Sequence, residues 1–263
     1  MKIPVKKWYE SIHTRYSQHK YMDKKIKPFT LKAFEKKVED LNEEFAEVRL
    51  QVYEKSIKDI LPALKGKYGN FTESPAFIAV IIKNKGEHRW LKAGYLGEAA
   101  LLEAEAHGLG TCWVAGRYQP NLSKVDIKLE QDEMLVAVSP IGYSSESYNI
   151  TRHFISKLFP HRDRKSLEEL CPDGYDQDWP GWVKNAVKSA STAPSRLNRQ
   201  PWRFYYGEGR LVLDCKGDPS AYKRLECGIA LLHLEVGALD GGADGKIEFG
   251  EMGLASFIKE GER

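Results

Sequence analysis

A rigid, polar loop two-thirds of the way along the chain carries residue types that could hold a flat ring. Residues 193–204 read APSRLNRQPWRF. Pro194 and Pro201 fix φ at about −65° and remove backbone donors, so the loop loses little entropy when a ligand binds. Between the prolines lie donors and acceptors that suit a heteroaromatic ring with alternating carbonyl and nitrogen atoms: Ser195, Arg196, Asn198 and Gln200. A structural turn capped by Asn198 is the competing explanation.

A short basic segment near the N-terminus could bind a phosphate. Arg15 and Ser17 flank Tyr16, and His19 follows two residues later. A guanidinium beside a hydroxyl suits phosphate oxygens because the hydrogen bonds of the guanidinium are charge-assisted. A solvated basic turn explains the same residues.

Two further basic residues, Arg164 and Lys165, lie in a polar stretch beyond the middle of the chain. They could close on the same phosphate from the opposite side. A solvated linker accounts for them equally well, so the sequence leaves their role open.

A glycine-rich segment offers backbone groups to a ligand. Residues 108–116 read GLGTCWVAG and lead from the end of a predicted helix into a short strand. Glycines there permit close approach of the backbone to a ligand. The segment is not a dinucleotide fingerprint, because its glycines end a helix whereas G-x-G-x-x-G must begin one. Amides near Ala115 and Gly116 could instead face an electron-rich ring atom.

Hydrophobic periodicity places these segments on regular elements. Apolar residues at helical spacing predict a helix that opens residues 4–21 and further helices over about 30–45, 94–110, 182–191 and 227–242. Short β-branched or aromatic runs predict strands at 75–83, 111–116, 134–143, 204–206 and 210–215. The loop thus follows a helix and precedes a strand pair.

The chain divides into two halves with a weak internal similarity. Residues 1–150 form the first half, residues 151–177 are a basic linker, and residues 178–263 form a shorter second half. The last helix superimposes on its first-half counterpart without gaps, with Gly97 on Gly228 and Gly110 on Gly241. We therefore predict an internal duplication.

The composition gives no sign of a nucleic-acid or membrane partner, so we expect ligands to bind in pockets. Of the 263 residues 42% are hydrophobic, and 40 basic and 37 acidic residues spread along the chain give a net charge of +3. No basic block favours nucleic acid or a membrane surface, and no run approaches the roughly 18 apolar residues of a membrane span. The charged start lacks the apolar core of a signal peptide, so we expect a cytoplasmic protein.

Other potential ligand sites have simpler explanations. The four cysteines show no C-x-x-C spacing, which favours buried or free thiols over disulfides or zinc. The seven histidines never pair at metal-ligand spacing. Residues 240–251 resemble a calcium loop, but Gly242 removes a ligand and a turn explains the segment better. We expect no metal.

Taken together, these segments resemble the nitroreductase family of FMN-dependent oxidoreductases. The resemblance rests on Arg15-Tyr16-Ser17, on APSRLNRQPWRF, and on GYLGEAALLEAEAHGLGTCWVAG from Gly94 to Gly116. It also includes PIGY at 140–143 and RKSLEEL at 164–170, and so touches nearly the whole chain. It implies an α+β fold, an α/β/α sandwich with mixed, largely antiparallel sheets. Family members are usually homodimers with FMN at the dimer interface.

The resemblance assigns roles residue by residue. It implies that Arg15, Ser17 and Arg164 or Lys165 hold the phosphate, with His19 in a slot where many relatives carry Lys or Arg. The ring system would contact Pro194, Ser195, Arg196, Asn198 and Gln200. The backbone of Val114, Ala115 and Gly116 would face flavin N5, and Tyr16 and Trp113 complete the expected cofactor-binding set.

One departure from the family pattern changes the expected number of sites. In ordinary members the APS-x-x-N-x-QPW loop precedes the glycine-rich helix, whereas here it lies in the second half and residues 46–53 occupy its usual position. This resembles a fused subset in which two halves of one chain mimic the family homodimer. First-half segments and the second-half loop would build one FMN site per chain. The second site would lack a loop and would carry DGGAD at 240–244 instead of GLGTCW. A monomer would suffice, and a homodimer remains compatible.

The implied activity belongs to the cofactor. NADH or NADPH would pass hydride to N5, leave, and be replaced by a small electron acceptor such as a nitroaromatic or quinone, in ping-pong fashion. No side-chain acid or base is needed. Two alternatives remain: a flavin-binding protein that stores, senses or processes FMN without turnover, and a relic with an empty pocket.

Overall fold

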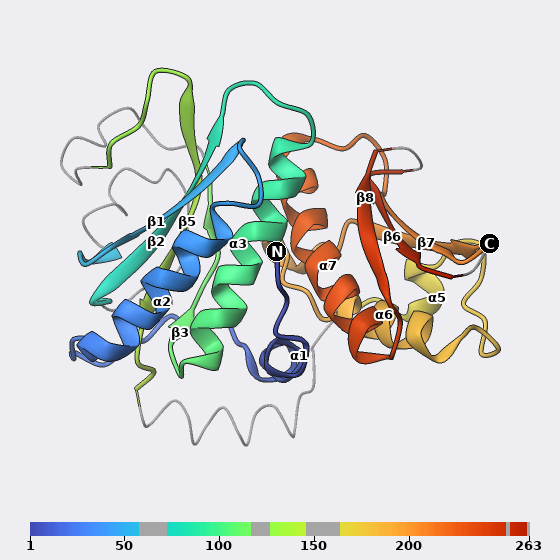
Figure 1. Cartoon of the computed structure of the whole chain (residues 1–263), viewed down its shortest axis with the longest axis horizontal. Helices are drawn as coiled ribbons and strands as arrows, with labels where there is room; N and C mark the ends of the chain where they lie inside the picture. The colour runs from blue at the N-terminus through green and yellow to red at the C-terminus, as the bar shows by residue number, and fades with distance from the viewer. Residues whose placement is uncertain (58–72, 117–126, 146–163, 251–252, 262–263) are drawn as a thin grey trace. The chain divides into compact units, whose positions relative to one another are not determined.

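The computed structural model describes residues 1–57, 73–116, 127–145, 164–250 and 253–261. The chain forms two compact units (Figure 1). Unit 1 comprises Met1, Thr14–Arg89 and Ala100–Pro160, and unit 2 comprises Lys2–His13, Trp90–Ala99 and His161–Arg263. The sequence-based division at residues 150 and 178 stays a prediction.

Unit 1 contains an antiparallel sheet with strand order β1-β2-β5-β3, in which β4 also pairs with β5. The strands are β1 (Val48–Tyr53), β2 (Ala76–Lys83), β3 (Gly110–Thr111), β4 (Val114–Ala115) and β5 (Glu133–Gly142). In β2 the residues from Ala76 to Ile82 are all buried, which explains why its sequence is continuously apolar. Helix α2 (Pro28–Leu41) packs against β1.

Unit 2 contains a second antiparallel sheet, with strand order β6-β7-β9-β8. The strands are β6 (Trp202–Gly207), β7 (Arg210–Cys215), β8 (Gly245–Phe249) and β9 (Ala255–Lys259). The helices are α1 (Val5–Thr14), α5 (Leu167–Leu170), α6 (Gly181–Ser191) and α7 (Ala221–Asp240), with a 3₁₀ turn η4 (Arg196–Asn198). Helix α7 packs on α6 and contacts all four strands. The predicted α+β class with largely antiparallel sheets is confirmed.

The two sheets repeat one topology. Among the described residues, the segments 28–142 and 181–259 each run through a helix, two paired strands, a long helix and further strands, with α3 (Arg89–Ala106) in the place of α7. Replacing β1, β2, β5 and β3 by β6, β7, β9 and β8 converts one strand order into the other. In this correspondence the segment between α6 and β6, which carries the polar loop, matches residues 42–47 between α2 and β1. The sequence had assigned residues 46–53 to that position, but most of them form β1.

Two glycines allow a close crossing of α3 and α7. A Cβ atom added to Gly94 would lie 1.9 Å from the carbonyl oxygen of Leu225, and one added to Gly228 would lie 1.9 Å from that of Leu91. The contacts are reciprocal, so Gly94 corresponds to Gly228. The gapless sequence alignment had paired Gly97 with Gly228, three residues away. A shift of three keeps the same helix face, so periodicity alone did not fix the register.

Several predicted boundaries are wrong. Helix α2 begins at Pro28, not Thr30, because proline fits the first helical turn. It ends at Leu41, not near Phe45, since the Asn42 side chain bonds both backbone groups of Leu50 in β1. The long helices begin earlier than predicted, α3 at Arg89 and α7 at Ala221, because their charged first turns conceal the helical pattern.

Three strands were not predicted at all: β1, β8 and β9. Strand β8 begins at Gly245, inside the segment that resembled a calcium loop, so that resemblance does not reflect the local structure. Within the described residues every helix is too short or too polar to cross a lipid bilayer.

Candidate functional site

The loop between the two prolines has an unusual backbone. Leu197, Asn198 and Gln200 have φ angles of 51°, 54° and 48°, in the left-handed region that favours glycine. For a non-glycine residue this conformation costs roughly 1–2 kcal/mol, and asparagine tolerates it best. Leu197 is 78% exposed, so no burial of its side chain offsets the cost. Backbone strain of this kind persists only where surrounding contacts enforce it.

Gln200 is the centre of those contacts. Its side chain is almost fully buried. Its backbone N–H donates to Ser195 Oγ at 2.9 Å, and its Nε2 donates to the Asn198 carbonyl at 3.0 Å. Its Oε1 accepts from the Lys165 backbone N–H at 3.0 Å. The amide therefore holds the loop closed and joins it to residue 165.

Lys165 and Glu226 fix the loop from outside. The Lys165 ammonium donates to the carbonyls of Arg199 and Gln200 at 2.7 and 3.0 Å. On the opposite side, Glu226 Oε1 accepts from the Arg196 backbone N–H at 2.7 Å. Burial raises the pKa of Glu226, while the Arg196 N–H and neighbouring cations lower it.

Arg164 reaches the end of the helix that leads into the loop. Its guanidinium donates to the carbonyls of Ser191, Thr192 and Ala193 at 3.2, 2.8 and 2.6 Å. A cation on the last carbonyls of a helix stabilises its C-terminus. The structure therefore gives Arg164 a clear role in positioning the loop, and phosphate binding by Arg164 stays a prediction.

In unit 1, the N-terminal basic segment lies beside the glycine-rich segment. Ser17 forms a parallel bridge with Thr111, and the Gln18 N–H donates to the Thr111 carbonyl at 2.8 Å. His19 Nε2 lies 3.5 Å from Cys112 Sγ. Residues nearly one hundred positions apart in sequence are thereby brought together.

Cys112 is the point at which the unit 1 side chains converge. Burial raises the pKa of its thiol to about 11, although the Arg15 guanidinium and a hydrogen bond with Ser17 favour the thiolate. Burial also lowers the pKa of His19. At neutral pH the thiol is therefore protonated, and Cys112 is not poised as a nucleophile.

The remaining predicted residues of unit 1 frame this cluster. Val114 and Ala115 form β4, which pairs with Val138 and Ala137 of β5. Val114 is buried, whereas Trp113, Ala115 and Gly116 are half-buried. Tyr16 is 44% exposed. The predicted residues thus fall into two groups, residues 15–19 with 113–116 in unit 1 and residues 164–165 with 194–200 in unit 2.

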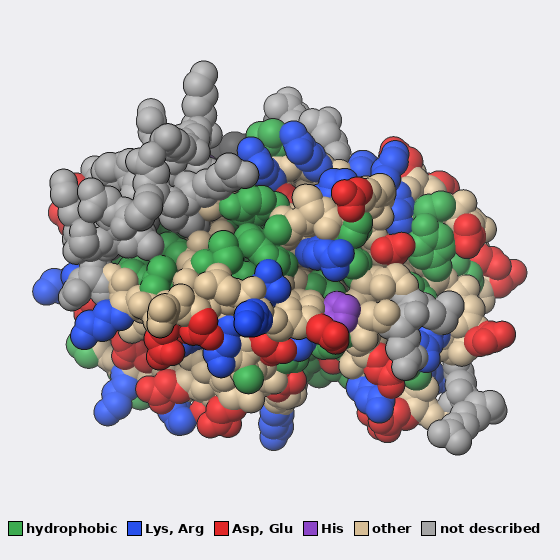
Figure 2. Space-filling model, turned by 90° about the horizontal axis from the view of Figure 1, so that it is seen from above, with side chains coloured by type: hydrophobic (Ala, Val, Ile, Leu, Met, Phe, Trp, Pro, Cys, Tyr) green, Lys and Arg blue, Asp and Glu red, His purple; other side chains and the backbone are tan. Residues whose placement is uncertain are grey.

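Sequence reasoning missed several side chains of these groups. Cys112, Gln18 and Glu226 all make the contacts described above. Cys112 and Gln18 lie inside segments that the sequence marked, but their side chains were assigned no role, and Glu226 lies outside every marked segment. Their shared signal is burial of a polar group, which only the fold reveals: Gln18 is 1% and Glu226 7% exposed. Side chains of opposite charge are interspersed over the face shown in Figure 2, so surface charge alone did not mark the site.

The donors gathered in unit 1 could hold the phosphate group of a cofactor. In unit 1 the Arg15 guanidinium, the Ser17 hydroxyl and the His19 imidazole all act on the Cys112 thiol, and groups of these types can also bind phosphate oxygens. The side-chain oxygens of Gln18 and Thr111 there are buried and lack a hydrogen-bond partner among the described residues. A buried oxygen without a hydrogen bond destabilises the fold unless a ligand or a water molecule supplies the missing donor.

Comparisons with known proteins give the family. The family model described as "Putative TM nitroreductase" matches residues 7–238. A crystal structure of a "putative nitroreductase" from Thermotoga maritima MSB8 is similar with a TM-score of 0.63 and 20% identity, over 96% of this chain and 93% of that one. No curated protein matched the chain.

Two further solved structures cover about half of this chain. An FMN-dependent nitroreductase from Clostridium difficile R20291 is 19% identical over 52% of this chain and 87% of that one, with a TM-score of 0.43. A nitroreductase family protein from Clostridium novyi NT is 24% identical over 54% of this chain and 87% of that one, also with a TM-score of 0.43. Since the family model spans most of the sequence, the chain belongs to this nitroreductase family, whose members are oxidoreductases.

Proposed function

We propose that this protein is an FMN-dependent oxidoreductase that uses NADH or NADPH to reduce small electrophilic acceptors such as nitroaromatics or quinones. The observation that carries the proposal is the strained loop from Pro194 to Pro201. Three left-handed residues, Leu197, Asn198 and Gln200, lie in this loop, and contacts of Gln200 with Lys165 and of Arg196 with Glu226 hold it in place. A strained backbone that is kept in place by several contacts is typical of ligand sites.

The two groups of residues would hold different parts of the cofactor. Arg15 would supply a cationic donor and Ser17 a hydroxyl donor for the phosphate. The His19 imidazole would add a hydrogen-bonding group that burial keeps neutral, because burial lowers its pKa. Ser195, Arg196 and Asn198 supply donors and acceptors for the ring edge. When bound, FMN supplies the hydride-accepting and hydride-donating chemistry. The chain itself would bind, orient and shield the ring, and backbone groups near Ala115 and Gly116 would face its reactive edge.

The repeated topology supports a single site per chain. Only the second repeat has a proline-bounded polar loop between its helix and its first strand. The matching segment of the first repeat, residues 42–47, reads NEEFAE and carries none of the loop's residues. We therefore propose that the chain is a fused, diverged pair of family subunits with one functional loop.

The visible absorption spectrum of the purified protein is the decisive experiment. Oxidised flavin bands at about one FMN per chain, bleached by NADH or NADPH under anaerobic conditions, are the expected result. Two FMN per chain would overturn the single-site proposal. FMN without bleaching by either nucleotide would indicate a flavin-storing, sensing or processing protein. A colourless protein that does not take up added FMN would indicate a relic with an empty pocket.

Variants in each group test the assignment of residues. Arg15→Ala should lower the FMN content at least ten-fold by removing the charge-assisted hydrogen bonds to the phosphate. Asn198→Ala should weaken FMN binding by removing ring-edge hydrogen bonds. Lys188→Ala, at an exposed position of α6, is the matched control and should retain FMN. Full FMN content in both test variants would contradict the assignment.

A further inference from the structure

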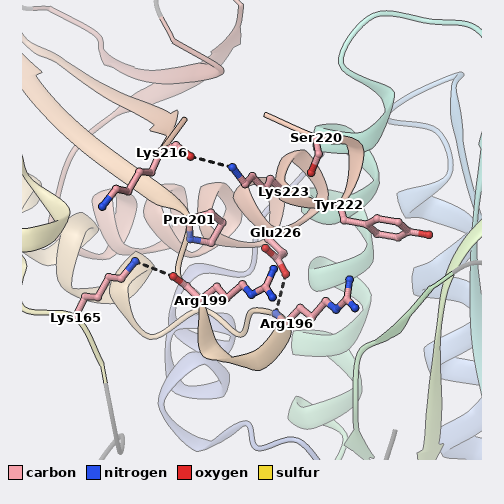
Figure 3. Close-up of a pocket in the computed structure, with 9 residues that line it drawn as sticks. All are labelled: Lys165, Arg196, Arg199, Pro201, Lys216, Ser220, Tyr222, Lys223 and Glu226. Atoms are coloured by element: carbon pink, nitrogen blue, oxygen red, sulfur yellow. Dashed lines mark hydrogen bonds between the residues drawn. The ribbon is translucent and has the colours of Figure 1, made fainter. Parts of the chain in front are cut away.

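A cavity of about 300 Å³ in unit 2 is lined by far more positive than negative charge (Figure 3). It lies between the polar loop, the end of β7 and the first turn of α7. Its charged lining consists of five cations and one carboxylate: Lys165, Arg196, Arg199, Lys216, Lys223 and Glu226. Of these, the sequence analysis assigned only Lys165 and Arg196 to a ligand.

The positive charges of this basic cavity are not neutralised by ion pairs. The Lys223 ammonium donates to the backbone carbonyls of Lys216 and Asp218 at 3.1 and 3.0 Å, and Lys165 is likewise held by carbonyls. Among the described residues the guanidinium groups of Arg196 and Arg199 have no hydrogen-bond or salt-bridge partner. Lys165 and Lys223 are therefore positioned by neutral carbonyls, and Glu226 is the one carboxylate among the lining residues that can offset the five positive charges.

Mutual repulsion among these cations is visible at Lys165. Burial lowers the pKa of its ammonium, and the nearby charges of Arg203 and Lys216 lower it further. Glu226 is 7% exposed and tied to the Arg196 N–H, and Arg199, Arg196 and Lys223 act on its carboxylate. One carboxylate leaves an excess of positive charge, which a polyanion would relieve.

The cavity has two chemically different ends. In Figure 3, Tyr222 and Arg196 lie at one end, and the ammonium groups of Lys165 and Lys216 lie at the other. The Tyr222 ring packs edge-on against Trp90 with ring centroids 5.2 Å apart, which fixes its orientation. A phenol ring and a guanidinium both offer flat faces to a nucleobase, while ammonium groups bind phosphate.

We propose that this basic cavity binds the adenosine 2′-phosphate portion of NADPH, and that the protein therefore prefers NADPH to NADH as electron donor. This inference rests on the proposed function. A volume at the lower end of the range for ligand pockets suits part of a dinucleotide rather than all of it. Arg196 and Pro201 belong both to the cavity wall and to the proposed flavin loop, so the donor would bind beside the cofactor.

Equilibrium binding of nucleotide fragments to the full-length protein tests the proposal independently of turnover. Calorimetric titration with 2′,5′-ADP should give at least ten-fold tighter binding than 5′-AMP, because only the former carries the 2′-phosphate. The same preference should appear as a kcat/KM for NADPH at least ten-fold above that for NADH. A protein without flavin reduction but with selective 2′,5′-ADP binding would refute the proposed function and leave the cavity assignment intact.

Two substitutions and one control assign the binding to this cavity. Lys216→Gln and Lys223→Gln should each weaken 2′,5′-ADP binding at least five-fold, and Lys216→Gln leaves the loop contacts of Lys165 in place. Lys188→Gln, exposed on α6 and outside the cavity, should bind 2′,5′-ADP as the unmodified protein does. Thermal melting of each variant separates loss of binding from loss of folding.

Three results would overturn the proposal. The first is equal binding of 2′,5′-ADP and 5′-AMP. The second is inorganic phosphate binding as tightly as 2′,5′-ADP, which would make the cavity a simple anion site. The third is displacement of 2′,5′-ADP by FMN in the flavin-loaded protein, which would assign the cavity to the flavin phosphate instead.

Discussion

At the residue scale, the polar loop shows what side-chain chemistry predicts and what it does not. The sequence predicted a rigid, hydrogen-bonding loop because prolines and amides act locally. It did not predict left-handed backbone at Leu197, since leucine disfavours that conformation. Distant partners such as Lys165 and Glu226 impose it, and distant contacts are not encoded in local sequence.

Leu197 offers a direct test of that strain. Leu197→Gly should be more stable than Leu197→Ala by about 1 kcal/mol, because glycine adopts a φ of 51° without a steric penalty whereas alanine does not. The two variants remove the same exposed side chain, so each is the control for the other. Urea denaturation measures the difference. Equal stabilities would mean that the loop is not left-handed in solution.

A second residue-scale prediction concerns acid stability. The Arg49 guanidinium donates through Nε to Glu133 Oε1 at 2.8 Å, and this hydrogen bond holds the pKa of Glu133 below its usual range. A lowered folded-state pKa contributes stability above the unfolded value of about 4.3, and that contribution is lost as the pH falls through the folded-state pKa. Glu133→Gln should therefore be less stable than the unmodified protein at pH 7, with a difference that shrinks below about pH 4.

Chemical denaturation at a series of pH values checks this prediction. Glu87→Gln, at an exposed turn position, is the control and should follow the unmodified protein throughout. A stability gap for Glu133→Gln that stays constant down to pH 2 would contradict the proposed linkage.

At the scale of secondary-structure elements, prediction succeeded where the apolar pattern was clear and failed where polar side chains interrupted it. Helix α1 and strands β2, β5 and β7 carry clear apolar patterns and were located from sequence. Strand β1 reads VRLQVY with charged and amide side chains, and β8 reads GKIEF, so neither stands out. Their positions depend on pairing with β2 and β9, which is a tertiary property.

The crossing of α3 and α7 gives an element-scale prediction. Gly228→Ala should lower the free energy of unfolding by at least about 2 kcal/mol, because the new methyl group would meet the backbone of Leu91 and Tyr95 at 1.9 and 2.8 Å. Backbone atoms cannot rotate away, so the helices must separate. Gly181→Ala is the control, since no atom lies within 4 Å of its added Cβ, and it should change stability by less than about 0.5 kcal/mol. Similar stabilities of the two variants would contradict the close crossing.

At the scale of the whole molecule, the sequence predicted the family and the fold class from motifs that lie far apart. It could not fix the correspondence between the halves, because a three-residue shift preserves helical periodicity. The order of the strands gives the correspondence between the halves, because β1, β2, β5 and β3 are arranged in their sheet as β6, β7, β9 and β8 are in theirs. The duplication remains our proposal, and the number of FMN molecules bound per chain, which it sets at one, can be measured.

That count should be independent of the oligomeric state. Sedimentation velocity with detection at a flavin wavelength should show FMN moving with the monomer on dilution, at the same ratio of about one per chain found at high concentration. This follows if a single chain supplies every segment that holds the cofactor. Release of FMN in step with dissociation of a dimer would show instead that two chains build the site.

The path of the chain between the compact units has a consequence for folding. Residues 2–13 and 90–99 belong to unit 2, although the segments around them belong to unit 1, and the boundary at Ala99 falls inside helix α3. Neither unit is a continuous stretch, so no single cut releases one of them whole. Because unit 2 combines residues 2–13 and 90–99 with residues 161–263, its core cannot be complete until that third segment has been synthesised. We therefore expect unfolding in one cooperative transition, and slow folding governed by long-range contacts.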